Sequence, residues 1–227
     1  MRACIASSNF SNPLGSAMSD AGKQKLVALL ARRKIPLIED DLYGDLYHSG
    51  ERPKPAQCFD REGLVMLCAS FSKTLAPGYR LGWCVLGRFR GRVEQLQMAA
   101  TLALPKASQL AVASYLQCGA YQRQLRAMRS AFALQAAQMI AAIGREFPAG
   151  TKVTRPAGGF LLWVELPRSI DAIRLCEQAL ERRISLSPGP MFSARLRYRN
   201  FIRVNCGFPW SPQIERAIRR LASWRAA

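Results

Sequence analysis

The sequence predicts an α/β fold in which a large α/β unit is followed by a smaller α+β unit. Two strand-sized apolar runs, 64–69 and 81–86, flank a break of small and hydroxylated residues, which is typical of a buried sheet with a polar loop at its edge. After residue 150, short apolar runs alternate with helical patterns. A hydrophobic share of 49% supplies enough side chains for a packed core.

The first half of the chain reads as alternating strands and helices. A strand pattern over 2–8 ends in an Asn-Pro-x-Gly turn signal, so Asn12 is expected just past a strand end, where open α/β sheets bind ligands. Ser19 and Asp20 can cap the helix that follows. The elements expected here are a strand over 2–8, a helix from Ser19 to about Lys34, a strand from Pro36, an irregular segment over 44–63, the central strand over 64–69, and helices over 88–103 and 108–117.

A long helical pattern over 121–147 separates the two predicted units. Helices of this length often carry a chain from one domain into the next, so the boundary is placed near residue 118, giving units 1–118 and 119–227. The elements expected in the second unit are strands over 152–155, 159–166, 184–187 and 201–206, and helices over 171–183 and 211–224. Pro212 suits the first turn of the last helix.

Composition argues against a membrane, disulfide or metal protein. No segment holds about 18 uninterrupted apolar residues, and the N-terminus lacks the apolar core of a signal peptide. The seven cysteines are scattered without a Cys-x-x-Cys pair, and His48 is the single histidine. We therefore expect no membrane contact, no metal, and a location in the reducing cytoplasm.

The net charge of +18 raises the question of nucleic-acid binding. Most of the excess is arginine in short groups spread along the chain, such as Arg88, Arg90 and Arg92. No basic tract, helix-turn-helix, zinc-finger or RRM signature accompanies these groups. The arginines are therefore interpreted as a solvated basic surface, and DNA binding by this chain alone is not expected.

Lys73 stands at the end of the central strand, between Ser72 and Thr74. Desolvation at such a position disfavours an ammonium ion and makes a neutral, nucleophilic amine available, as Schiff-base chemistry requires. The hydroxyls of Ser70 and Ser72 and the guanidinium of Arg80 could hold a phosphate beside it. For an isolated Ser-x-Ser-Lys, a solvated surface loop is the simpler interpretation.

The full segment makes the chemical interpretation more specific. Residues 70–83 read Ser-Phe-Ser-Lys-Thr-Leu-Ala-Pro-Gly-Tyr-Arg-Leu-Gly-Trp. This resembles the cofactor-lysine segment of fold type I pyridoxal-phosphate (PLP) enzymes, and most of all the aminotransferase-like domain of MocR-type regulators in the GntR family. Three further segments are similar to that family: Asn-Pro-x-Gly at 12–15, Pro-x-Gly-Gly-x-x-x-Trp at 156–163, and Phe-Ile-Arg-Val-Asn at 201–205.

The resemblance implies roles for individual residues. Lys73 would hold PLP as an internal aldimine and, once released, shuttle a proton. Asp40, in an Asp-x-x-Tyr pattern, would keep the ring nitrogen protonated, which makes the ring an electron sink. Asp41 is the competing candidate, one residue out of register with Tyr43. The residues assigned to cofactor or substrate are Lys73; Asp40 at the ring nitrogen; Asn12 and Tyr43 at the 3′-oxygen; Ser70, Ser72 and Arg80 at the phosphate; and Arg203 at the substrate carboxylate.

The resemblance runs from Asn12 to the C-terminus and covers the later portion of the family's domain: part of the large α/β domain and the small α+β domain. The sequence before Asn12 holds no phosphate-binding turn that opens a helix, no ring-stacking aromatic residue and no winged helix. We therefore expect the chain to be an N-terminally truncated part of a longer protein.

Two functions follow from the resemblance. The first is an aminotransferase that moves an amino group between an amino acid and a keto acid through the Lys73 aldimine. The second is the effector-sensing PLP domain of a transcription regulator that lacks its DNA-binding module. The family implies a homodimer for the full-length form, and DNA contact only through the missing N-terminal module.

Overall fold

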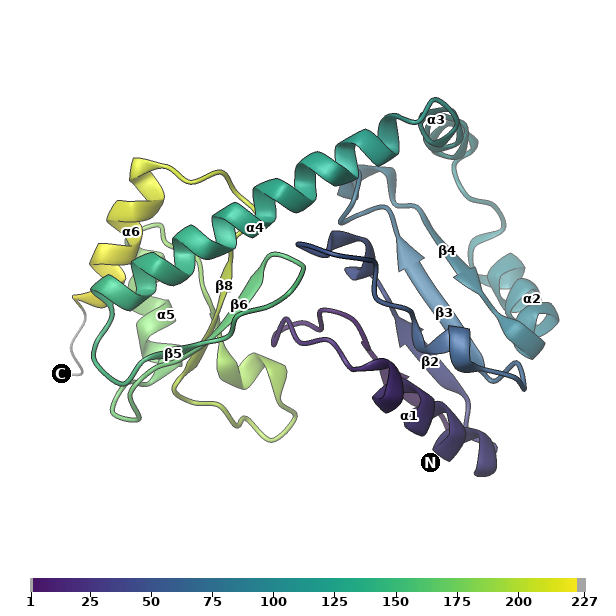
Figure 1. The fold of residues 1–227 in the computed structure, drawn as a ribbon, viewed down its shortest axis with the longest axis horizontal. Helices are drawn as coiled ribbons and strands as arrows, with labels where there is room; N and C mark the ends of the chain where they lie inside the picture. Colours follow the sequence, from purple (N-terminus) through teal and green to yellow (C-terminus); the bar gives the residue numbers. More distant parts are fainter. Residues whose placement is uncertain (1, 224–227) are drawn as a thin grey trace. The chain divides into compact units, whose positions relative to one another are not determined.

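The computed structural model describes residues 2–223, which divide into two compact units (Figure 1). The first unit joins the chain up to Ser11 with Ser16–Arg129, and the second joins Asn12–Gly15 with the chain from Ser130. Helix α4 (Ala120–Glu146) belongs to both, because its first turns pack in the first unit and its later turns in the second. The predicted boundary near residue 118 precedes this helix, whereas the change of unit falls inside it.

The first unit is built on a four-stranded sheet in the order β1 (Cys4–Ala6), β2 (Leu37–Asp40), β3 (Val65–Ser70) and β4 (Gly82–Val85). The first three strands are parallel, and β4 runs antiparallel to β3. Parallel strands end at the same edge of a sheet, so the polar residues after β2 and β3 are brought to one edge.

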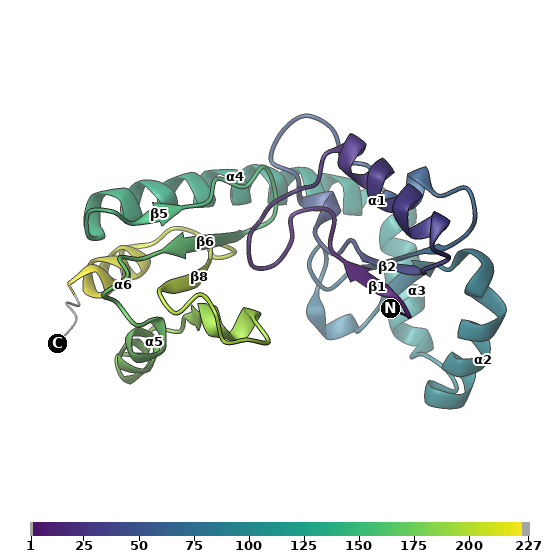
Figure 2. The same ribbon diagram turned by 90° about the horizontal axis from the view of Figure 1, so that it is seen from below.

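Helix α1 (Asp20–Arg32) covers one face of this sheet (Figure 2). Its N-cap Ser19 accepts a hydrogen bond from the backbone N–H of Gly22, as the sequence predicts. The buried side chains of the resulting core come from the helix, from two strands and from the connection before β3: Val27, Leu30, Leu37, Ala56 and Val65. This face is the well-packed side of the first unit.

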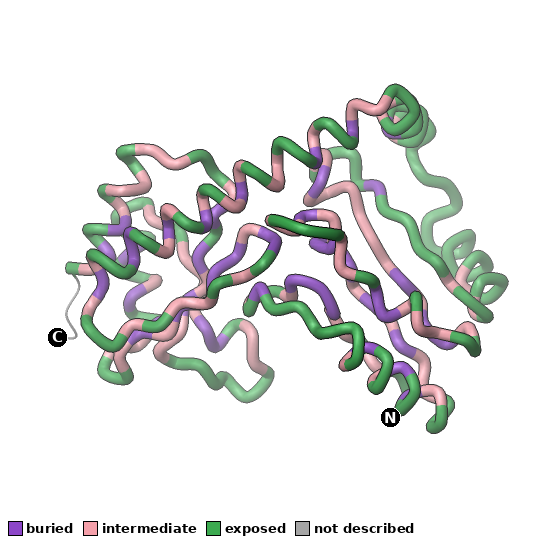
Figure 3. The backbone as a smooth tube through the Cα atoms, viewed as in Figure 1, coloured by how far each residue is buried: buried purple, intermediate pink, exposed green. Residues whose placement is uncertain are grey.

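Strand β4 and helices α2 (Arg90–Thr101) and α3 (Lys106–Gln117) are much more exposed than the part of the unit around α1 (Figure 3). Ile5, which points away from α1, is 74% exposed, and all four residues of β4 are exposed. Helix α2 (Arg90–Thr101) buries none of its residues, and α3 (Lys106–Gln117) buries only Val112. The first unit therefore keeps apolar side chains in solvent on one side.

The second unit is an antiparallel sheet in the order β5-β6-β8-β7, with helices on one face. Its elements are β5 (Lys152–Val153), β6 (Leu161–Glu165), α5 (Ala172–Glu181), β7 (Ser187–Pro188), β8 (Phe201–Asn205) and α6 (Pro212–Ala222). Leu162, Val164 and Ile202 face the helices in the core. Trp163 and Arg203 are paired across β6 and β8 and lie on the other face.

The second unit departs from the prediction at β7. The strand predicted over 184–187 is confined to Ser187–Pro188. Arg183 adopts a left-handed φ of 61°, and the backbone N–H of Ile184 donates to the carbonyl of Ala179 at 2.9 Å. These residues end helix α5 and so are not available to the sheet. Trp224, the last residue of the predicted helix 211–224, lies outside the described residues.

Short 3-10 helices complete the fold: η1 (Gly44–Leu46), η2 (Ala56–Phe59), η3 (Pro77–Tyr79), η4 (Gly87–Phe89) and η5 (Gly189–Phe192). Two of them lie in the segment 44–63 that the sequence predicts to be irregular. Among residues 2–223, no helix has both the length and the apolar character needed to cross a membrane.

Candidate functional site

Lys73 lies in the loop that follows β3, at the carboxyl edge of the sheet. The loop is tight, because the carbonyl of Phe71 accepts from the backbone N–H of Leu75 at 2.8 Å and of Ala76 at 3.1 Å. Its entry is fixed to the strand that follows by a bond from Phe71 N–H to the carbonyl of Leu81 at 3.1 Å. Lys73 is half-buried. The fold thus puts the predicted nucleophile where open α/β sheets bind their ligands.

Two hydroxyls and one guanidinium accompany Lys73. The Oγ atoms of Ser70 and Ser72 lie 3.0 Å apart, and the backbone N–H of Ser72 donates to Ser70 Oγ at 3.1 Å. Arg80 is exposed and has a left-handed φ of 51°, and its contact with the carbonyl of Pro77 is long, at 3.5 Å. The hydroxyls are therefore held in place, while the guanidinium is only weakly held and can turn toward an anion.

Helix α4 supports this loop through contacts that the sequence analysis missed. Tyr121 Oη donates to Thr74 Oγ1 at 2.9 Å, and Gln124 Nε2 donates to the carbonyl of Thr74 at 3.0 Å. The rings of Phe71 and Tyr121 meet edge to face, with 5.9 Å between their centroids. Phe71 and Thr74, which stand on either side of Lys73 in the loop, are thus anchored to α4. No motif marks Tyr121 or Gln124, because the contacts join residues about fifty positions apart.

The three acids at the end of β2 have different surroundings. Glu39 is fully buried; it accepts from Ser8 Oγ and from the backbone N–H groups of Ala56 at 2.6 Å and Gln57 at 2.9 Å. These bonds tie β2 to η2. Glu39 is therefore a structural carboxylate.

Asp41 is also a structural carboxylate. Its side chain is fully buried, accepts from Asn9 Nδ2 at 2.8 Å, and pairs with Arg52 Nη2 at 2.5 Å. Asn9 in turn accepts from the buried Lys23 Nζ at 2.7 Å, and burial lowers the pKa of Lys23. Arg52 continues the network to Asp45 at 2.7 Å. The oxygens of Asp41 are thus committed to protein partners.

Asp40 differs from both neighbours. It is half-buried, its Oδ1 accepts from the backbone N–H of Leu42 at 3.2 Å, and it makes no ion pair within residues 2–223. Tyr43, the aromatic residue of the predicted Asp-x-x-Tyr pattern, is buried directly before η1. Of the three consecutive acids, Asp40 is the one whose surroundings leave it available to a ligand.

In the second unit, Asn12 and Arg203 are in direct contact. Arg203 Nη1 donates to Asn12 Oδ1 at 3.0 Å, and Nη2 donates to Ser187 Oγ at 3.0 Å. Arg203 Nε is buried without a hydrogen-bond partner, and the guanidinium carbon lies 5.1 Å from the centroid of the Phe192 ring. The bond uses the amide oxygen of Asn12 and leaves its Nδ2 as a donor. The sequence analysis named Asn12 and Arg203 as candidates and did not name their neighbours Ser187 and Phe192.

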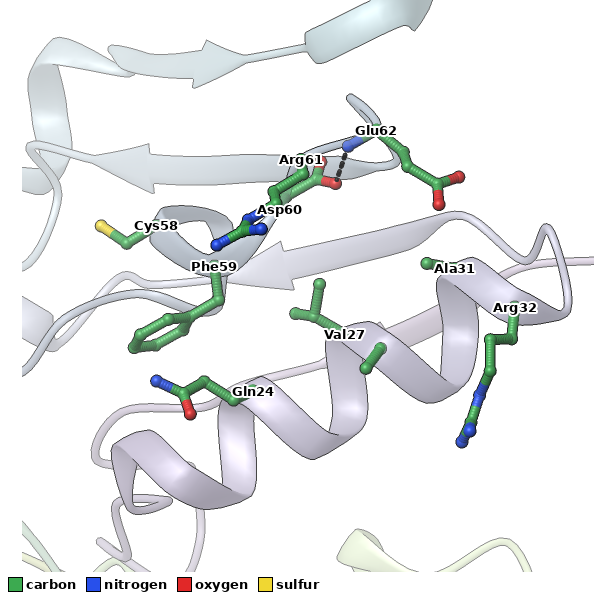
Figure 4. Close-up of a pocket in the computed structure, with 10 residues that line it drawn as sticks. Gln24, Val27, Ala31, Arg32, Cys58, Phe59, Asp60, Arg61 and Glu62 are labelled. Carbon is green, nitrogen blue, oxygen red and sulfur yellow. Dashed lines mark hydrogen bonds between the residues drawn. The ribbon is translucent and has the colours of Figure 1, made fainter.

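A surface pocket of about 570 Å³ lies between α1 and the segment 58–62 (Figure 4). None of its lining residues is one of the predicted site residues. One of its two carboxylates, that of Asp60, accepts from the backbone N–H groups of Glu62 at 2.9 Å and Val65 at 2.7 Å, and so holds the turn before β3. The pocket is on the α1 face and is not the candidate site. Within the described residues, no group of three or more His, Cys, Asp or Glu is placed to hold a metal.

The strands of the first unit bring a lysine, two hydroxyls and a carboxylate without an ion pair to one edge of the sheet. A protein with this fold and these groups belongs to the class of PLP-dependent transferases of fold type I. The chain is a member of the aminotransferase class I and II family, whose model matches residues 2–221. The predicted fold class and family resemblance are thereby confirmed.

Individual relatives agree with this membership. The chain is 38% identical over 97% of its length to an uncharacterized HTH-type transcriptional regulator of Escherichia coli, YdcR, of which it covers 47%. It is 31% identical to aromatic-amino-acid aminotransferase 1 of Thermococcus litoralis, with 94% of this chain and 51% of that protein covered. The crystal structure of Pyrococcus horikoshii kynurenine aminotransferase, in complex with PMP, matches 98% of this chain and 55% of that one, with a TM-score of 0.91 and 30% identity. The chain thus spans about half the length of these curated relatives.

Proposed function

We propose that this chain binds PLP and carries the lysine and substrate-binding residues of an aminotransferase. The observation that supports this most directly is the contrast among the three acids. The carboxylates of Glu39 and Asp41 are bonded to protein groups that hold the fold together, whereas Asp40 accepts only one backbone hydrogen bond among the described residues. Asp40 is register partner to Cys68 on β3, the strand that leads into the Lys73 loop. A carboxylate and an amine at one sheet edge are the two groups that this cofactor needs from a protein.

PLP, when bound, supplies an aldehyde that condenses with amines and a ring that accepts electrons from the substrate. Lys73 is assigned as the nucleophile and as the group that carries a proton to and from the substrate α-carbon. Asp40 is assigned to hold the proton on the ring nitrogen, and Tyr43 to donate toward the 3′-oxygen. Ser70 and Ser72, together with Arg80, are assigned to the phosphate because their hydroxyl and guanidinium groups match its acceptor oxygens.

Arg203 is assigned to the α-carboxylate of an amino acid or keto acid. Its position on a central strand of the second unit, between Asn12 and Ser187, restricts its rotamers and favours a two-point contact with a planar carboxylate. Asn12 is assigned to the 3′-oxygen of the cofactor. Its oxygen already accepts from Arg203, which leaves Nδ2 to donate to the 3′-oxygen.

A second function is favoured by the relatives. An HTH-type transcriptional regulator is 38% identical to this chain, above the 31% of the named aminotransferase. The same residues would then sense an amino compound as an effector, with little or no amino transfer. In either case we infer that DNA contact belongs to a separate module and that the full-length form is a homodimer.

A PLP titration with a single-turnover assay tests the proposed function. We expect the chain to bind PLP more weakly than about 1 µM, because two hydroxyls and one exposed arginine satisfy only part of a dianionic phosphate. With PLP in excess, amino acids from a panel should release keto acid in amounts up to one per loaded chain.

Each outcome of this assay has a distinct meaning. A loaded chain that releases no keto acid from any amino acid but changes its absorbance on binding one would favour the effector function. A chain that shows no absorbance of lysine-bound PLP at millimolar cofactor would contradict both functions. Submicromolar affinity with steady turnover would show that the phosphate is held by more than these three residues.

Replacing Arg203 with lysine is expected to raise the amino-acid concentration needed for half-maximal reaction by about 10-fold to 100-fold, because a lysine cannot make the two-point contact. PLP affinity should change little. The measurement compares both constants with those of Arg197→Lys, which makes the same substitution at an exposed position. Equal effects of the two substitutions would rule Arg203 out as the carboxylate ligand.

A further inference from the structure

Two cysteines lie directly opposite each other on neighbouring strands of the first unit. Cys68 on β3 is the register partner of Cys84 on the antiparallel strand β4, and their Sγ atoms are 3.6 Å apart. Cys68 is also the register partner of Asp40 on β2. Paired residues point to the same side of a sheet, so Asp40, Cys68 and Cys84 form one row on the face away from α1.

The backbone geometry suits a covalent bond between the two sulfurs. Directly opposed residues of antiparallel strands have Cα atoms about 4.5 or 5.5 Å apart. Both values fall inside the range of about 4.4–6.8 Å found for disulfides. The sulfurs need to approach from 3.6 Å to about 2.05 Å, which small changes of side-chain torsion supply without a shift of the strands.

We propose that Cys68 and Cys84 form a dithiol site that reacts with hydrogen peroxide and closes to a cross-strand disulfide beside Asp40. This inference does not depend on whether the chain binds PLP. It differs from the other five cysteines in that each of these lacks a sulfur partner among the contacts of the described residues. Disulfides of proteins in reducing compartments are usually transient and redox-sensing, which is the behaviour expected here.

The exposure of the two thiols sets the order of the steps. Cys84 is exposed, so peroxide reaches it first: the O–O bond breaks, a sulfur–oxygen bond forms on Cys84, and one water leaves. The sulfur of Cys68 then attacks that of Cys84, the sulfur–oxygen bond breaks, and the hydroxide leaves as a second water with the Cys68 proton. Two thiols have then given two electrons to one peroxide.

The second step should depend on pH. Burial, the adjacent Cys84 thiol and the Asp40 carboxylate raise the pKa of Cys68 to about 11. These two groups, one on β4 and one on β2, are the titratable groups that act on it. Since the thiolate is the attacking form, ring closure should accelerate as the pH rises from 7 toward the pKa of Cys68.

The test exposes the full chain to graded hydrogen peroxide, blocks the remaining thiols with an alkylating agent, and maps the peptides without reduction. We expect a peptide pair joined through Cys68 and Cys84, loss of two of the seven thiols, and reversal by dithiothreitol. Cys118→Ser removes another exposed cysteine and should leave the link unchanged. Cys68→Ser should leave Cys84 at the sulfenic acid and beyond.

Two results would overturn the proposal. One is a wild-type chain in which Cys84 is oxidised to sulfinic acid while Cys68 remains alkylatable. The other is a disulfide pattern made of links between chains, through Cys58 or Cys118 as often as through Cys84. Both results are measured on the wild-type chain, so they remain valid even if a serine variant folds poorly.

Discussion

Replacing Lys73 with alanine is expected to reduce covalent attachment of PLP from near stoichiometric to background. Lys73 is the one lysine of seven in the loop after β3, beside the paired hydroxyls of Ser70 and Ser72. Without its amine, the cofactor can still meet these groups but cannot be fixed to the chain. The measurement is borohydride reduction with PLP in excess, followed by mass mapping of the labelled peptide.

Lys106→Ala is the matched control, because Lys106 is an exposed lysine at the start of α3. It should retain full labelling at residue 73. If label persisted on the Lys73→Ala chain at an undiminished level, or if most of the wild-type label were on Lys106, the nucleophile would have been misassigned. The outcome bears on the aminotransferase and the effector functions alike, since both use this amine.

The second large effect distinguishes the roles of two adjacent aspartates, Asp40 and Asp41. Asp41→Ala should lower the free energy of unfolding by about 3 kcal/mol, because it leaves Arg52 and Asn9 without the buried carboxylate they share. Asp40→Ala should cost little stability and instead change the absorbance of lysine-bound PLP, since no anion then holds the ring proton. Denaturant titration and absorbance spectra of both variants measure the two effects.

Asp45→Ala provides the control for the Asp41 effect. Asp45 also pairs with Arg52, at 2.7 Å, but its side chain is 33% exposed, so its loss should cost less than about 1 kcal/mol. A destabilising Asp40→Ala together with a harmless Asp41→Ala would mean that the two residues exchange roles. It would also put Tyr43 out of register with the cofactor.

Much of the fold could be predicted from the sequence, because its elements carry local signals. The cap at Ser19, the apolar run before Lys73 and the long helical pattern after residue 120 each correspond to an observed element. Lys73 and Arg203 could be named as candidates because their neighbours form recognisable segments. The spacing to Tyr43 favoured Asp40 over Asp41, and burial of Asp41 gives a physical reason for the same choice.

The contacts that complete the candidate site could not be predicted in this way. Asn12 and Arg203 are 191 positions apart, and Tyr121 reaches Thr74 across 47 positions. Such pairs depend on which strands become neighbours and in what register, and no local pattern encodes either. The sulfur pair was missed for the same reason: scattered cysteines in sequence became opposed only through the pairing of β3 with β4.

The exposure of α2 has a consequence for how the first unit opens. A twelve-residue helix is marginal in water by itself, and α2 has no buried side chain to hold it. The ion pair of Arg90 with Glu94 at 2.7 Å adds little to this, because both side chains are exposed and water screens their attraction. Amide protons of α2 should therefore exchange with solvent through local fraying. Those of β6 and β8 should exchange only when the second unit unfolds. A partner that covered α2 would slow the exchange of its amide protons and leave the exchange of the β6 and β8 amide protons unchanged.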